Sequence, residues 1–218
     1  TKGVGTTTIT ATASNGKSAS ASIKVEVDNP NITGAYTYNE TTCSTGRENT
    51  CEVNTCLLNK TAGSCPAGTT ISYKVNDTTT QDFHVLKDNG SILTLIATDN
   101  TVSNVAWDSS GSNANGPRTA IQSLENATNS WTNAVANTYN ESIGIATRSR
   151  MITNTEAESV GCKAYSGPVC PLWITSSNWI NERNGTSNAY HINENRTVGW
   201  TDVTSTVDGV RAVIDVSK

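Results

Sequence analysis

The sequence has few of the residues that usually fill a protein core, and few charges. Its 218 residues include one Phe and one Met, and charged residues make up 16% of the chain. The core must therefore be built from aliphatic residues, the five Trp and some of the six Tyr. Thr, Ser, Asn and Gly dominate the remainder, a composition that favours strands, turns and polar surface over long helices.

Basic runs and long apolar runs are also missing. Lys and Arg are scattered in a chain of net charge -4 and pI about 5.2, which leaves no electrostatic footprint for a nucleic acid. No stretch approaches the roughly 20 apolar residues that span a bilayer, so we expect no membrane insertion of this fragment. The chain starts at Thr1 without a signal peptide, and we expect a mature or excised fragment whose export signal and anchor lie elsewhere.

Histidine is scarce, and this restricts the catalytic chemistry that the chain could perform. His84 and His191 are the two histidines, and neither is accompanied by a Gly-x-Ser-x-Gly elbow or another nucleophile signature. Phosphate loops and dinucleotide fingerprints are missing too. Glu156 and Glu158 stand at a predicted helix start, where capping and the helix dipole explain carboxylates. We predict no catalytic residues and a protein that is not an enzyme.

Six cysteines are present, and an even number in such a chain predicts disulfides and an oxidising, extracellular compartment. Zinc binding is the alternative, but Cys-x-x-Cys pairs and neighbouring histidines are both missing. Cys162 and Cys170 bracket a short turn-rich loop, and we predict that they pair with each other. The other four allow three pairings, among which nearest neighbours would give small local loops: Cys43, Cys51, Cys56 and Cys65.

The first segment carries a hairpin signal. Residues 8–12 and 21–27 alternate between polar and apolar or small side chains, and Asn15-Gly16 between them favours a tight turn. The stretch GTTTITATASNGKSASASIKVEV resembles the last two strands of a group 2 bacterial immunoglobulin-like domain, a stalk module of bacterial surface proteins. The resemblance predicts that residues 1–28 are the terminal strands of such a module.

We predict a cysteine-rich, loop-rich connecting segment with short strands at residues 29–70, and an α+β domain at residues 71–218. Strands are expected at 70–75, 83–86 and 91–96, the last two joined across Asp88-Asn89-Gly90. A helix is expected over 117–136, capped by Asn115-Gly116 and with Pro117 in its first turn. One stripe of this helix predicts a core-facing side: Ile121, Leu124, Thr128, Trp131 and Val135.

A second helix is predicted after a short strand at residues 150–152. Thr153 and Glu156 have the spacing of a capping box, and Gly161 is a helix stop. Residues 171–174 then predict a strand that leads away from the Cys162–Cys170 loop. Three further strands are expected at 189–193, 197–201 and 210–216.

The larger part of the chain resembles known families. RMITNTEAESVG resembles a stretch of formylglycine-generating-enzyme-like domains, which have C-type-lectin-like folds, and GVRAVI at 209–214 is similar to their closing strand. Residues 70–218 also resemble Firmicutes surface or pilin-associated proteins, in the stretches 116–133, 150–157, 161–173 and 209–218. This implies a C-type-lectin-like α+β fold with two helices and several antiparallel strands. The enzymatic activity is not implied, because it needs a later copper-binding cysteine pair, and no cysteine follows Cys170.

The resemblance implies a recognition surface in the loops and strands between Asn178 and Ser205. Aromatic rings for contact area and short polar side chains for hydrogen bonds gather there: Trp179, Tyr190, Asn193, Glu194, Asn195, Trp200 and Asp202. The competing interpretation is a solvated, ligand-free loop whose Trp residues turn inward.

We predict no cofactor, with calcium as the alternative. Sugar-binding lectins of this fold use a Trp-Asn-Asp motif at a calcium site, and the Gly199–Asp202 stretch matches it only in part. Glu194, Asn195 and Asp202 could supply three oxygen ligands, which is fewer than the roughly six to eight that calcium takes.

The sequence as a whole predicts an adhesin-like binding domain on a bacterial cell surface or pilus. Its partner would be a host or neighbouring-cell protein or glycan. The alternative is a purely structural subunit or spacer of a surface appendage or phage fibre, which would assemble into that appendage. The third hypothesis is an enzyme of the formylglycine-generating type.

Overall fold

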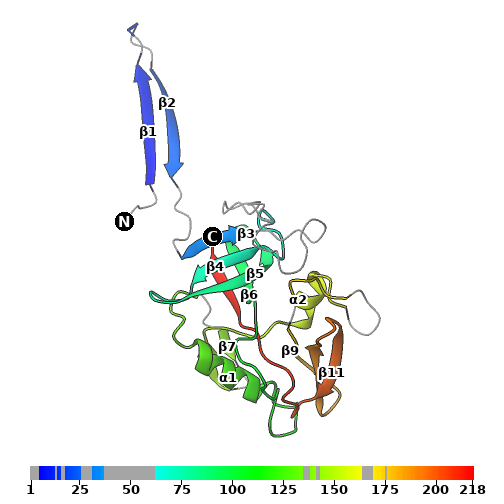
Figure 1. The fold of residues 1–218 in the computed structure, drawn as a ribbon. Coiled ribbons are helices and arrows are strands. Elements are labelled where there is room, and N and C mark those ends of the chain that lie inside the picture. Colours follow the sequence, from blue (N-terminus) through cyan, green and yellow to red (C-terminus); the bar gives the residue numbers. More distant parts are fainter. Residues whose placement is uncertain are drawn as a thin grey trace. The chain divides into compact units, whose positions relative to one another are not determined.

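The computed structural model describes residues 5–12, 14–15, 18–25, 31–36, 62–134, 138–140, 143–163, 169–174 and 176–218. The chain divides into two compact units, Thr1–Pro30 and Asn31–Lys218. In the first unit, β1 (Gly5–Thr12) and β2 (Ser18–Val25) pair antiparallel, with Ile9 opposite Ala21 (Figure 1). The hairpin predicted from the alternating pattern is therefore confirmed.

The second unit is built on a five-stranded antiparallel sheet. Its strands are β3 (Ile32–Tyr36), β4 (Thr70–Lys74), β5 (Thr80–Asp88), β6 (Ile92–Ala97) and β12 (Val213–Ser217), in the order β12-β6-β5-β4-β3. The edge strand β3 comes from the predicted connecting segment, so part of that segment belongs to the sheet. The predicted loops at 37–61, with Cys43, Cys51 and Cys56, lie outside the described residues.

The two faces of this sheet bury different side chains, because successive residues of a strand point to opposite sides. One face carries Phe83 and Leu95 into a core cluster with Leu124 of the first helix. The other face carries Ile96 and Val213 into a second cluster, shared with the second helix and with Cys162 and Cys170. The sheet is thus covered on both sides (Figure 1).

Helix α1 (Arg118–Thr128) is shorter than the sequence predicts. It begins after Pro117 without a side-chain cap, so the predicted Asn115-Gly116 cap is wrong. The Trp131 N–H donates to the Thr128 carbonyl at 2.9 Å, and the Trp131 ring packs edge-on against Phe83 at 5.8 Å between centroids. The chain leaves the helix after Thr128 and brings Trp131 to this contact with the sheet.

The predicted core-facing stripe of α1 is confirmed where the structure describes it. Ile121, Leu124 and Thr128 are fully buried, and Trp131 is buried just beyond the helix end. Val135 lies outside the described residues.

Helix α2 (Asn154–Ser159) follows its sequence signals closely. Thr153 and Glu156 form the predicted capping box, each side chain bonding a backbone N–H of the helix start. Gly161, at φ +101°, ends the helix. Its N–H donates to Glu158 O at 3.0 Å, and the Cys162 N–H donates to Ala157 O at 3.0 Å. These two bonds form a Schellman motif, which turns the chain and sets the position of Cys162.

The remaining strands form two smaller antiparallel sheets. β7 (Thr138–Asn140) pairs with β8 (Ile145–Thr147), and β9 (Asn178–Asn184), β10 (Asn188–Ile192) and β11 (Val198–Asp202) form a sheet in the order β11-β10-β9. β9 was not predicted, because its sequence NWINERN has few apolar residues. The strand predicted at 171–174 is wrong: the Ile174 N–H donates to Pro171 O at 3.0 Å and closes a turn.

The described part of the second unit is therefore an α+β structure, mostly antiparallel strands with two short helices. In the part of the chain that the structure describes, neither helix is long and apolar enough to cross a membrane.

Candidate binding site

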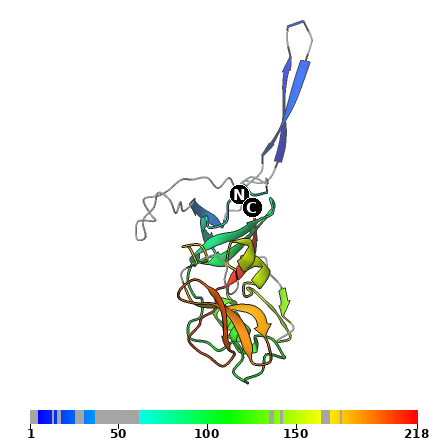
Figure 2. The same ribbon diagram turned by 90° about the vertical axis from the view of Figure 1, so that its right-hand side faces the viewer.

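The three-stranded sheet (Figure 2, orange to red-brown) places three of the sequence-predicted site residues on one side: Tyr190, Trp200 and Asp202. Cross-strand partners in a sheet share a face, so the register defines rows of side chains. The first row, Asn178, Ile192 and Val198, is buried in the core. The second row pairs Tyr190 with Trp200.

The third row consists of Asn184, Asn188 and Asp202, at the end of the sheet away from the core. Asp202 is exposed, and both asparagines are partly exposed. The Asn113 amide donates to Gly185 O at 3.1 Å and to Asn188 O at 2.8 Å, which fixes the β9–β10 turn below this row. The face therefore passes along the strands from a buried row through an aromatic row to a polar, partly exposed one.

Trp200 is the exposed member of the aromatic row. Trp200 is 48% exposed. It is the one aromatic residue among the exposed large hydrophobic residues in the described part of the chain. Its cross-strand partner Tyr190 is half-buried against the core cluster of the second helix. A ring of this size at the surface offers contact area with little side-chain entropy to lose on binding.

Trp179 does not belong to this surface, and its assignment to a recognition site is wrong. It is fully buried, and its indole N–H donates to Val105 O at 2.7 Å. Its ring lies 5.9 Å from that of His191, its cross-strand partner on the other face. The competing interpretation, a Trp that turns inward, holds for this residue.

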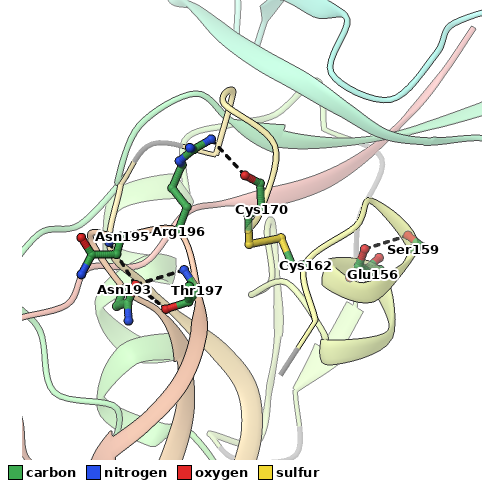
Figure 3. The surroundings of a disulfide bond; sticks show 8 residues. All are labelled: Glu156, Ser159, Cys162, Cys170, Asn193, Asn195, Arg196 and Thr197. Atoms are coloured by element: carbon green, nitrogen blue, oxygen red, sulfur yellow. Dashed lines mark hydrogen bonds between the residues drawn. A yellow bond between two sulfur atoms is a disulfide. The ribbon is translucent and has the colours of Figure 1, made fainter. Parts of the chain in front are cut away.

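The turn between β10 and β11 holds three other predicted site residues, and it is closed by its own hydrogen bonds (Figure 3). The Asn193 side-chain oxygen accepts from the N–H groups of Asn195 and Thr197 and from the Thr197 hydroxyl, each at 3.0 Å. Arg196 donates to Cys170 O at 3.0 Å and ties the turn to the disulfide. Asn193 is thus a structural residue, whereas Glu194 and Asn195 are exposed.

The three candidate calcium ligands are not brought together. Asp202 pairs with Asn188 at one end of the β10–β11 hairpin, and the turn with Glu194 and Asn195 lies at the other end. The five residues of β11 separate them by about 13 Å, at a strand rise of about 3.3 Å per residue. The described residues contain no group of three or more His, Cys, Asp or Glu side chains suited to a metal ion.

The predicted Cys162–Cys170 disulfide is present, with a Cα–Cα distance of 4.3 Å, and both cysteines are buried (Figure 3). In the chain-entropy model, closing so short a loop stabilises the fold by about 2–3 kcal/mol. Cys65 is also buried and disulfide-bonded, and its partner lies outside the described residues. The pairing among the first four cysteines stays a prediction.

His191 meets a buried carboxylate and a serine, an arrangement that invites comparison with a catalytic triad. Its Nδ1 lies 2.9 Å from Asp208 Oδ2, and Asp208 is fully buried. The Ser177 hydroxyl, however, donates to Asp208 Oδ1 at 2.7 Å. The carboxylate therefore stands between the serine and the imidazole, whereas a nucleophile needs its base within hydrogen-bond reach. The cluster links three loop and strand segments of the fold.

His84, the other histidine, lies under Trp173, with ring centroids 5.2 Å apart. Burial, and then the positive charge of Arg211, lower the pKa of His84 from 6.5 to about 4. Arg211 is itself buried, which lowers its pKa to about 10, and its Nε donates to Ala97 O at 2.6 Å. His84 is therefore neutral at physiological pH, and it is partly buried against Trp173.

This environment predicts an acid-sensitive fold. The unfolded chain binds a proton at His84 near pH 6.5 and the folded chain only near pH 4, so lowering the pH through this window favours unfolding. The free energy of unfolding should fall by about 3 kcal/mol over the window from this residue alone. Urea titrations at several pH values measure it. In His84→Gln the loss over the same window should be smaller by that amount; an unchanged pH profile would refute the assignment.

Sequence reasoning missed the buried polar residues Asp208 and Arg211 and the row residues Asn184 and Asn188. The register could have supplied Asn188: once β10 and β11 are joined by the Asn193–Thr197 turn, alternation places residues 188, 190, 200 and 202 on one face. Asn184 lies on β9, which was not predicted. Asp208 and Arg211 have no comparable local signal.

Comparisons of the chain with protein-family models, curated proteins and solved structures find no match.

Proposed function

We propose that this chain is an adhesin-like binding domain of a bacterial cell surface or pilus, with a C-type-lectin-like fold in its second unit. Its partner is a protein or glycan of a host or neighbouring cell. The observation that carries the proposal is the half-exposed Trp200, set beside Tyr190 on a face that ends in a polar row. Aromatic rings bordered by amides and carboxylates are the usual composition of a contact surface.

Two further observations support a binding role outside the cell. The disulfide at Cys162–Cys170 fits an oxidising compartment. The Ser177 hydroxyl beside the His191–Asp208 pair donates to the carboxylate, which does not favour a nucleophile activated by the imidazole. The sequence resemblance to surface and pilin-associated proteins agrees with both.

The test is adhesion of the purified chain to bacterial and host cells, with Trp200→Ala as the variant. We expect adhesion to fall at least about tenfold, because truncating an exposed aromatic anchor removes contact area without opening a core cavity. Thermal unfolding should show that the variant keeps its fold.

Ile145→Ala is the matched control, since Ile145 is 43% exposed and lies on β8, outside the three-stranded sheet. It should adhere like the parent. If the parent itself binds no cell, protein or glycan, the chain is a spacer or structural subunit. If Trp200→Ala adheres normally, the binding surface lies elsewhere.

A further inference from the structure

At the polar end of the face, the carboxylate of Asp202 follows the exposed ring of Trp200. Trp200 and Asp202 are two residues apart on β11, and alternation puts them on the same side, about 7 Å apart along the strand. An ammonium or guanidinium group over an indole ring lies within about 6 Å of its centre. One cation can therefore contact the Trp200 ring and the Asp202 carboxylate together.

The local structure holds Asp202 ready as an anion. Its Oδ1 accepts from the Thr204 N–H at 2.8 Å and from the Thr204 hydroxyl at 2.6 Å, and these bonds lower its pKa. Both bonds use Oδ1, so Oδ2 keeps its hydrogen-bonding capacity. The carboxylate stays ionised and oriented at neutral pH.

The basic residues within the three strands lie on the other side of the sheet, and Arg196, in the turn at the opposite end of the hairpin, is bonded to Cys170 O. Arg183 pairs with Ala189, and His191 pairs with Gly199, so both lie on the other side of the sheet. The rows on the Trp200 side contribute two asparagines and Asp202. The face is therefore locally negative, in a chain whose net charge is -4.

We infer that this face binds a lysine or arginine side chain of a partner protein, seated against Trp200 and Tyr190 and paired with Asp202. This inference rests on the proposed function and names the chemistry of its partner. The half-exposed ring attracts the cation through its π face, and the neighbouring carboxylate neutralises it. The partly exposed amide of Asn188 adds a polar border that can bond the backbone of the bound segment.

Peptide binding to the full chain tests this chemistry. The probes are a short lysine-containing peptide, the same peptide with each lysine Nε-acetylated, and a neutral oligosaccharide, each titrated by calorimetry. We expect the lysine peptide to bind at least about tenfold more tightly than its acetylated copy, and its affinity to fall as salt is added.

Asp202→Asn is the sharpest variant, because its amide oxygen can still accept both bonds from Thr204 while the charge is removed. It should weaken lysine-peptide binding about tenfold and remove most of the salt dependence. Asp77→Asn, a charge change at an exposed residue of another turn, should have no effect.

The outcomes separate this inference from the proposed function. Equal binding of the two peptides, or an Asp202→Asn variant that binds like the parent, overturns the cation site. If the oligosaccharide binds in a Trp200-dependent way and the lysine peptide does not, the face is a glycan site: the binding role stands and this inference fails. If cells adhere equally to the parent and to Trp200→Ala, the cation site fails and the binding surface lies elsewhere; if the parent itself binds no cell, protein or glycan, both proposals fail.

Discussion

Asp88→Asn should destabilise the second unit by about 3–5 kcal/mol, because it leaves a buried ammonium group without its counter-charge. Asp88 Oδ2 lies 2.7 Å from Lys218 Nζ, and the two side chains are 1% and 0% exposed. Lys218 also donates to Ser64 Oγ at 2.6 Å. Burial disfavours the ionised carboxyl, but Lys218 and the N–H groups of Cys65 and Gly90 outweigh it and lower the pKa of Asp88. Urea unfolding measures the effect.

A double-mutant cycle with Lys218→Met separates the ion pair from other losses. Lys218→Met alone leaves the Asp88 carboxylate buried without its counter-charge. The double variant removes both charges, so the double variant should be more stable than Asp88→Asn alone. Asp77→Asn at an exposed turn is the control, with an expected change within about 0.5 kcal/mol. Additive losses in the double variant would show that the pair is not coupled.

Leu124→Ala should lower the free energy of unfolding by about 2–5 kcal/mol, because it opens a cavity in the larger core. Leu124 is fully buried and packs in the cluster that α1 forms with the five-stranded sheet. The surrounding strands are fixed by their ladders and cannot close fully over the missing methyl groups. Thermal or urea unfolding gives the value.

Gln122→Ala is the control on the same helix. Gln122 is exposed, and its side-chain amide donates to the side chain of Asn126, which is also exposed. It should change stability by about 0.5 kcal/mol or less. A melting temperature that Leu124→Ala leaves unchanged would show that the helix does not contribute this face to the core.

The parts of the fold that the sequence predicted well depend on contacts between near neighbours. Alternation around Asn15-Gly16 predicted the first hairpin, and the Thr153–Glu156 capping box with Gly161 predicted α2 and its end. The same local turn sets the position of Cys162, which forms the disulfide with Cys170, eight residues further along the chain. In each case the deciding interactions lie within a few residues, where spacing and residue type specify them.

The parts that were missed depend on contacts between distant segments. Helix α1 ends early because Trp131 packs on Phe83 of β5, and β9 forms although its own sequence is weakly apolar, because β10 pairs with it. The candidate calcium ligands are near in sequence, yet the length of β11 separates them.

The two tryptophans of the candidate site show the division most clearly. Trp179 and Trp200 both lie in strands of one sheet with polar neighbours, and the sequence by itself determined that aromatic and polar residues gather there. Only the tertiary structure decided that Trp179 fills the core beside Val105 and that Trp200 faces solvent beside Asp202. Alternation fixes which residues of a strand share a side. Packing against segments far away in the chain decides which side is buried.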